Sequence, residues 1–224
     1  MKPLKSEVTD ASTLAELGRA SVQIVHDLKN QLNGLKLYAT FLRKRMEKTE
    51  RPEDERETVV KLIQGLERAA LDMTTLVRLG RPVELRRQPG VNLSALLAEA
   101  TNATGELTES SESLRGEFDA AALTDALKAI HTGAQALSAG KEDSEPPAVS
   151  LKRIESEAEP QALIEWRGLK SATDPFHSYA GSDALRMSLA AKIIEAHGGE
   201  ARFEANALTV RLPINAEGRM QSDE

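Results

Sequence analysis

The first part of the chain repeats apolar residues in the rhythm of a helix that packs in a bundle. Two neighbouring series advance in seven-residue steps, namely Leu14, Ser21, Leu28, Leu35 and Leu42, and Gly18, Val25, Leu32, Ala39 and Met46. An apolar seam kept for more than four heptads predicts one long amphipathic helix. Thr13 and Glu16 have the spacing of a capping box and are expected to start it. Arg51 followed by Pro52 is expected to end it, because proline disfavours helix in the residue before it.

A second helix is expected from about Glu53, with Gly80, Arg81 and Pro82 as its stop signal. Its apolar positions again follow heptad steps: Val59, Leu62, Leu66, Ala69, Met73 and Leu76. Two long helices joined by a short turn form an antiparallel hairpin, and one hairpin alone leaves a wide apolar face exposed. Pairing two hairpins into a four-helix bundle covers these faces, so we expect a homodimer.

The rest of the chain predicts a mixed α+β domain. Helical patterns cover residues 96–100, 123–137 and 184–197, and short strand patterns cover residues 149–154, 162–166, 201–204 and 208–212. Residues 104–113 and 140–147 are polar and are expected to be loops. We therefore expect a helical-hairpin domain over residues 1–84, an α+β domain over residues 85–214 and a disordered tail over residues 215–224.

Composition narrows the class of protein. The 224 residues carry a net charge of −6, which argues against nonspecific nucleic-acid binding. The absence of cysteine rules out disulfides and thiolate metal sites, and the four histidines lack metal-ligand spacing. No apolar run approaches the roughly 20 residues of a membrane span, and the N-terminus lacks an apolar signal core. We expect a cytoplasmic protein that binds neither nucleic acid nor membrane.

His26, Asp27 and Asn30 form the candidate chemical site. His26 follows Val25 of the apolar seam, so its ring is expected to point to solvent, with Asn30 one turn further on the same face. An exposed imidazole beside a carboxylate is suited to nucleophilic chemistry. The plain alternative is a solvated surface histidine, and the surrounding residues and the hairpin favour the functional interpretation.

The other histidines have simpler explanations. His197 precedes Gly198 at the end of an expected helix and is expected to cap that end. His131 is expected to be a packed or surface residue of another helix, and His177 lies in an expected loop with no ligand set nearby.

The run from His26 to Asn30, His-Asp-Leu-Lys-Asn, resembles the dimerisation and histidine-phosphotransfer domain of bacterial sensor histidine kinases. The resemblance covers roughly residues 12–80. Gln31 stands where the family usually has proline, so the helix is expected to run straighter. The resemblance implies that His26 accepts a phosphoryl group and that Asp27 orients the ring and accepts its proton. It also implies that Asn30 positions water for dephosphorylating a partner.

Residues 85–97, 174–176, 189–199 and 209–213 are similar to parts of the family's ATP-binding domain, which implies an ATPase-like α/β sandwich. Three polar elements of the family's nucleotide site are missing. Lys128 and Thr132 stand where asparagines should hold magnesium, and no Asp-x-Gly-x-Gly run follows Trp166. Residues 182–187 replace a glycine-rich turn that lets the backbone approach phosphate. We therefore expect no bound ATP or Mg²⁺, with any magnesium supplied by a partner receiver domain.

This combination resembles the histidine phosphotransferases derived from kinases. It implies that His26 relays a phosphoryl group between aspartates of response-regulator receiver domains, with an upstream histidine kinase as a further partner. Two alternatives remain open. The chain is a divergent but active cytosolic kinase that autophosphorylates His26, or it is a non-catalytic adaptor or inhibitor that docks on a kinase or response regulator.

Overall fold

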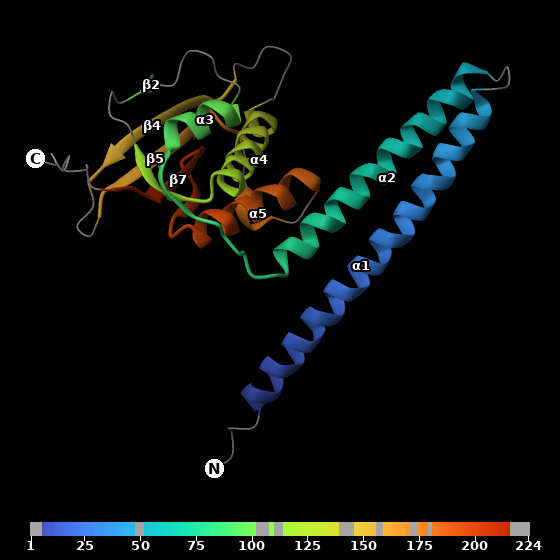
Figure 1. Ribbon diagram of the computed structural model, residues 1–224, viewed down its shortest axis with the longest axis horizontal. Coiled ribbons are helices and arrows are strands. Elements are labelled where there is room, and N and C mark those ends of the chain that lie inside the picture. Colours follow the sequence, from blue (N-terminus) through green and yellow to red (C-terminus); the bar gives the residue numbers. More distant parts are fainter. Residues whose placement is uncertain are drawn as a thin grey trace, which may run out of the picture. The chain divides into compact units, whose positions relative to one another are not determined.

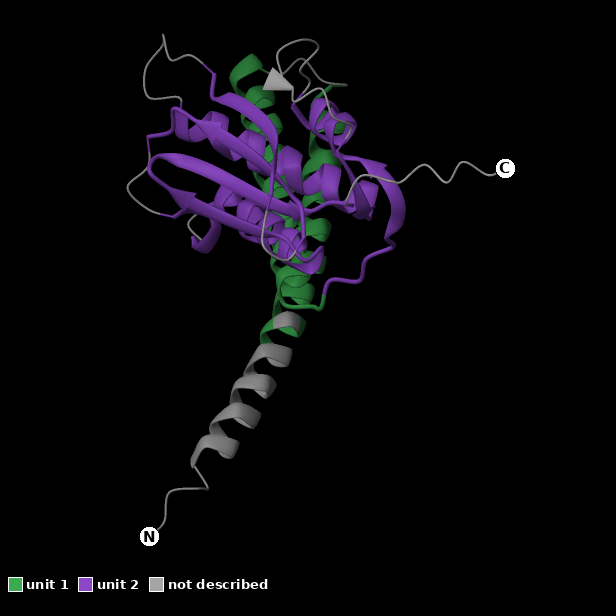
Figure 2. Cartoon of the chain, turned by 90° about the vertical axis from the view of Figure 1, so that its left-hand side faces the viewer, with its two compact units in different colours: residues 1–82 green, residues 83–224 purple. Residues whose placement is uncertain are grey.

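The computed structural model describes residues 6–47, 52–101, 108–109, 114–138, 146–155, 159–170, 174–178 and 181–215. The chain divides into two compact units, residues 1–82 and residues 83–224 (Figure 2). No helix in the described ranges combines the length and the apolar character needed to cross a bilayer.

The first unit is a hairpin of two helices, α1 (Ser6–Met46) and α2 (Glu53–Leu79), as expected (Figure 1). Pro52 occupies the N-cap of α2. Acidic residues fill the first turn of this helix, where the helix macrodipole favours negative charge. Gly80 ends α2, as the predicted stop signal indicated. The predicted boundaries of α1 were wrong. The helix begins at Ser6, because Thr13 and Glu16 suit a helix interior as well as a capping box, and it ends at Met46, before the predicted stop.

The two helices of the hairpin pack through one seam. Val25 and Leu32 turn partly away from solvent, and Ala39 is buried, as is Ile63 of α2. The ammonium of Lys36 on α1 lies 2.8 Å from the carboxylate of Glu67 on α2. A second apolar face of α1 stays exposed in the single chain. It consists of Ile24, Leu28, Leu35, Tyr38 and Leu42.

The second unit contains a five-stranded sheet in the order β2-β4-β5-β7-β6. The antiparallel part comprises β4 (Ala148–Ile154), β5 (Gln161–Arg167), β6 (Glu200–Glu204) and β7 (Ala207–Pro213). The short strand β2 (Thr108–Glu109) pairs in parallel with β4. Part of the predicted 104–113 loop is therefore a strand, because this pairing with a distant segment leaves no mark in so short a polar sequence. Residues 140–145 lie outside the described ranges.

Three helices cover one face of the sheet and give a two-layer α+β unit (Figure 1). They are α3 (Leu93–Thr101), α4 (Ala120–Ser138) and α5 (Ser182–Ala196). The core between the layers includes Trp166, Ile164 and Val210 of the sheet and Leu127 and Ile194 of the helices, all fully buried. The architecture thus matches the predicted hairpin followed by an ATPase-like α/β domain.

A separate two-stranded sheet pairs β1 (Gln88–Asn92) with β3 (Arg115–Phe118). The sequence patterns did not predict these strands, since Pro89 and Gly90 suggest a turn and β3 has only four residues. Of the predicted tail, Asn215 is described and donates its backbone N–H to the Arg115 carbonyl over 2.8 Å. The rest of the tail lies outside the described residues.

Candidate functional site

His26 lies on the outer surface of α1, next to Val25 of the packed seam. Its side chain is 51% exposed in the single chain. The expected solvent-facing position of this imidazole is therefore confirmed. A helix advances about 100° per residue, so Asn30, Leu37 and Phe41 follow His26 along one narrow strip of α1. This strip (His26, Asn30, Leu37 and Phe41), here called the histidine face, lies away from the exposed apolar face that contains Leu35.

Polar side chains gather around one ring nitrogen of His26. The Asn30 amide nitrogen lies 3.4 Å from His26 Nδ1, and the Asp27 Oδ1 oxygen lies 3.7 Å from the same atom. The Gln23 amide donates a hydrogen bond of 3.1 Å to Asp27 Oδ1, which holds that carboxylate from its other side. The structure therefore brings the three predicted site residues together and adds Gln23, which lies one turn before Asp27.

This arrangement distinguishes the two nitrogens of the ring. Nδ1 faces the carboxylate and the amide, whereas Nε2 has no hydrogen-bond partner among the described residues. A neutral imidazole that carries its proton on Nδ1 keeps a lone pair on Nε2. The orientation of such an amide is an assignment, so after a flip the Asn30 oxygen can accept the Nδ1 proton. The Asp27 carboxylate, 3.7 Å from Nδ1, adds a negative charge beside it. Nε2 is then an exposed nucleophile that can attack an incoming group.

The C-terminal unit has other contacts at the positions where the resemblance places nucleotide ligands. Lys128 directs its ammonium to Glu99 of α3 over 2.8 Å, and Thr132 is exposed. An ammonium group has no lone pair to offer Mg²⁺. In the replaced glycine turn, Asp183 and Arg186 belong to the first turns of α5 and approach each other to 3.6 Å. These side chains differ in chemistry from the amide oxygens and glycines of a nucleotide cradle.

Helices α4 and α5 touch directly at Gly133. A Cβ atom on Gly133 would lie 2.2 Å from the sulfur of Met187, which is itself buried. On the sheet side, the fully buried Trp166 donates its indole N–H to Nδ1 of His131 over 3.3 Å. The side chains of Met187, His131 and Trp166 therefore link α4 to α5 and to β5.

His197 and His177 make hydrogen bonds at the ends of helices. His197 is buried, and its Nδ1 donates to the Ile193 carbonyl in the last turn of α5, which confirms the predicted capping role. Burial lowers the pKa of His197, although the Ile193 contact opposes that shift. His177 is exposed in a short 3₁₀ helix, Pro175–His177, and its Nδ1 lies 2.7 Å from Asp174, the N-cap of that helix. Within the described ranges, no three His, Asp or Glu side chains converge as a metal site would require.

No protein-family model matches this sequence, and no curated protein matches it. The fold is similar to solved structures of histidine kinases. Full-length ShkA in complex with AMPPNP aligns with a TM-score of 0.59 at 14% identity, over 87% of this chain and 45% of that chain. The histidine kinase AdeS of Acinetobacter baumannii aligns with a TM-score of 0.53 at 16% identity, over 81% of this chain and 96% of that chain.

A third solved structure is the histidine kinase ThkA in complex with the response regulator protein TrrA. It aligns with a TM-score of 0.53 at 17% identity, over 96% of this chain and 67% of that chain. This chain therefore spans less than half of ShkA and about two thirds of the ThkA chain. The order of the elements, a long helical hairpin followed by three helices on a mixed five-stranded sheet, agrees with these likenesses. The chain has the fold of a sensor histidine kinase core.

Proposed function

We propose that this chain is a histidine phosphotransfer protein that relays a phosphoryl group between receiver-domain aspartates through His26. The observation that carries the proposal is the exposed imidazole with Asp27 and Asn30 at Nδ1 and nothing described at Nε2. An imidazole oriented through one nitrogen presents the other to an incoming phosphorus atom.

The relay step balances without a further reagent. Nε2 of His26 attacks the phosphorus of a receiver's aspartyl phosphate, the bond from phosphorus to the carboxylate oxygen breaks, and the carboxylate leaves with the electron pair. The phosphorylated ring is then cationic while its Nδ1 keeps a proton, and Asp27 stabilises that charge. An aspartate of a second receiver reverses the same steps. The receivers bring Mg²⁺, so the task of this chain is positioning.

The histidine face supplies a docking surface for such a receiver. Leu37 is 55% exposed and Phe41 61% exposed on the same strip as His26. Exposed apolar side chains beside a reactive group are typical of a protein interface. The complex of ThkA with a response regulator provides a precedent for this kind of partner in a protein of the same fold.

The second exposed face of α1 supports the homodimer. Its five large side chains would be costly to leave in water and have the heptad spacing of a bundle seam. In a four-helix bundle this face is covered, whereas the histidine face remains open. Dimerisation and receiver docking therefore use different sides of α1.

Loss of ATP binding is part of the proposal. Lys128 pairs with Glu99, and Asp183 and Arg186 approach each other where the resemblance places a glycine-rich turn. The alternative function is a divergent kinase, because ShkA, which has a similar fold, was solved in complex with AMPPNP. The two functions differ in the source of the phosphoryl group, because a kinase labels His26 from ATP without any receiver.

The test uses the purified 224-residue chain with two phosphate sources. We expect transfer from a receiver domain that carries labelled aspartyl phosphate and no labelling by Mg-ATP. His26→Gln should abolish acceptance, whereas His177→Gln, which removes another exposed histidine with a carboxylate partner, should leave it unchanged. Labelling of His26 by Mg-ATP alone would assign the chain to the kinases. Unchanged acceptance in His26→Gln would remove His26 from the reaction.

A further inference from the structure

The residues that follow the helical hairpin are tied to the C-terminal unit by hydrogen bonds. The backbone N–H of Arg86 donates to Asp119 Oδ2 over 2.8 Å. The guanidinium of Arg87 donates to the carbonyl of Ala196 at the end of α5. Arg87 thereby places a positive charge at a helix C-terminus, where the helix dipole favours it.

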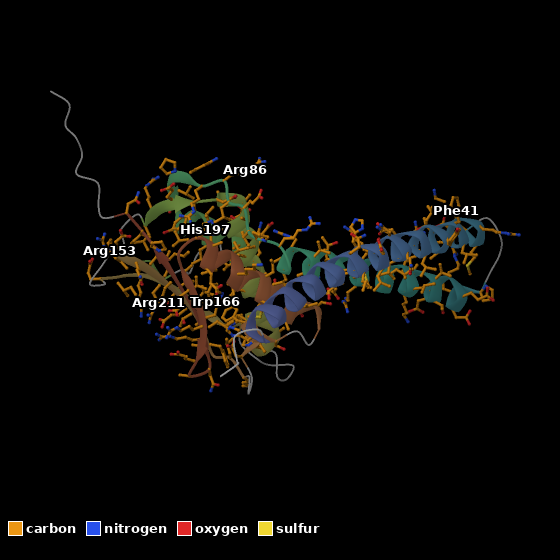
Figure 3. All side chains as sticks on the ribbon, turned by 90° about the horizontal axis from the view of Figure 1, so that it is seen from below. Phe41, Arg86, Arg153, Trp166, His197 and Arg211 are labelled. Atoms are coloured by element: carbon orange, nitrogen blue, oxygen red, sulfur yellow. The ribbon has the colours of Figure 1, made fainter. Side chains whose placement is uncertain are left out.

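Asp119 connects this segment to three other elements. It lies between β3 and α4, and its Oδ1 accepts the backbone N–H of Ala122 over 3.0 Å and so caps α4. Its own backbone N–H donates over 3.1 Å to Nε2 of His197, which follows α5. Both carboxylate oxygens and the backbone N–H of Asp119 are thus used, and Figure 3 shows Arg86 and His197 in the same part of the unit.

His197 is held in the orientation and protonation state that these contacts need. Nδ1 donates to the Ile193 carbonyl over 2.8 Å, so the lone pair of Nε2 is available to accept the Asp119 N–H. The ring also packs edge-on against Phe118 of β3, with ring centres 5.9 Å apart. The imidazole therefore joins the end of α5 to the turn between β3 and α4.

We propose that Arg86, Arg87, Asp119 and His197 form a clasp that fixes the start of the C-terminal unit and confines the joint between the two units to residues 80–85. Pro82 further restricts this stretch, because its ring fixes φ. A short joint limits the directions that the hairpin and the C-terminal unit can take, so opening the clasp would lengthen the joint and widen that range. This device is independent of the relay proposed above.

Limited trypsin digestion of the 224-residue chain tests the clasp at its own arginines. Trypsin cuts after Arg86 and Arg87 only when the segment leaves the unit, and it does not cut after Arg81 because proline follows. We expect both bonds to be cut slowly compared with the same bonds in a free peptide of residues 78–92. Asp119→Asn keeps one side-chain oxygen for two donors, so cutting should become roughly tenfold faster.

Asp125→Asn is the matched control, since Asp125 is an exposed residue of α4 outside the clasp. Trypsin should cut this variant after Arg86 and Arg87 at the same rate as the wild type. Melting curves must show that Asp119→Asn stays folded under the conditions of digestion. If Asp119→Asn does not stay folded, Arg87→Gln replaces it as the test. This variant loses the hydrogen bond to Ala196 but keeps the cleavable bond after Arg86. Trypsin should cut that bond at least threefold faster than in the wild type. Wild-type cutting at the rate of the free peptide, or unchanged rates in the folded variants, would overturn the clasp.

Discussion

Trp166 of β5 and His131 of α4 are joined by a hydrogen bond from the indole N–H to the imidazole Nδ1, 3.3 Å long. The acceptor nitrogen must be unprotonated, so the ring is neutral and carries its proton on Nε2. Burial of His131 lowers its pKa below the ordinary value of 6.5, which favours this neutral form. The pair connects the sheet to the helix layer.

Trp166 is the single tryptophan of the chain, so its fluorescence reports on this bond. Protonation of His131 removes the acceptor and places a positive charge beside the indole. We expect an emission change whose midpoint lies below pH 6.5, measured where circular dichroism still shows a folded protein. His131→Gln should remove the transition. A midpoint at or above 6.5, or an unchanged transition in this variant, would contradict the assignment.

Leu35 and Leu37 test the separation of the two exposed faces of α1. They are 53% and 55% exposed in the single chain, respectively, and lie on different sides of the helix. Leu35→Glu places a charge in the proposed dimer seam and should convert the dimer into a monomer. The measurement is light scattering after gel filtration.

Leu37→Glu is the matched variant. It should leave the dimer intact and slow phosphoryl transfer from the receiver, because Leu37 belongs to the histidine face. Loss of the dimer in Leu37→Glu but not in Leu35→Glu would exchange the roles assigned to the two faces.

The neighbours of His26 should contribute unequally to transfer. Asp27→Asn removes the charge that stabilises the phosphorylated ring, so acceptance from a phosphorylated receiver should slow roughly tenfold. Asn30→Ala should have a smaller effect on acceptance and a larger one on dephosphorylation of the receiver. Asn33→Ala is the control, since Asn33 is an exposed amide close to the same strip without a described contact to His26. Equal effects of the Asn30 and Asn33 substitutions would argue against a specific role for Asn30.

Gly133→Ala should destabilise the C-terminal unit. The new Cβ would meet the Met187 sulfur at 2.2 Å, and overpacking of a buried site typically costs about 1–3 kcal/mol. Met187→Ala removes the clashing atoms, so the double variant should lose less stability than the sum of the two single losses in thermal or urea unfolding. Gly34→Ala on α1 is the control, since a Cβ there meets nothing within 4 Å. A Gly133→Ala protein as stable as the wild type would show that α4 and α5 are packed more loosely than described.

The stability of the C-terminal unit should fall as the pH drops below 6.5. Burial lowers the pKa of His197 in the folded state, with Arg87 lowering it and Asp119 raising it, so the unfolded chain takes up the proton first. The contribution of neutral His197 to stability is fully present well above pH 6.5. It is lost progressively as the pH falls from 6.5 to the lower pKa that His197 has in the folded state. Urea unfolding between pH 8 and pH 5 measures this loss. His197→Gln should reduce it, and the remainder should come from His131, whose pKa is also lowered by burial. Asp119, whose pKa is lowered mainly by the backbone N–H groups of Ala122 and Arg86, adds a loss only near and below pH 3.8.

The sequence alone determined the features that depend on local periodicity. The heptad steps predicted both long helices, and the offset of His26 from Val25 predicted an exposed ring. The short strand patterns around Trp166 and Val210 likewise predicted β5 and β7. Each of these patterns is contained within one element, where the pitch of a helix or the pleat of a strand dictates which side chains share a face.

Only the tertiary structure decided the contacts between distant segments. Asp119 and His197 lie 78 residues apart, and Trp166 and His131 lie 35 residues apart, so no local pattern pairs them. The strands β2 and β3 are too short to carry a periodicity, and Pro89 and Gly90 hide β1. All three pair with a partner strand that satisfies their backbone groups. Local sequence can specify an element and its exposed face, whereas the hydrogen bonds that a buried imidazole makes depend on which elements the completed core brings together.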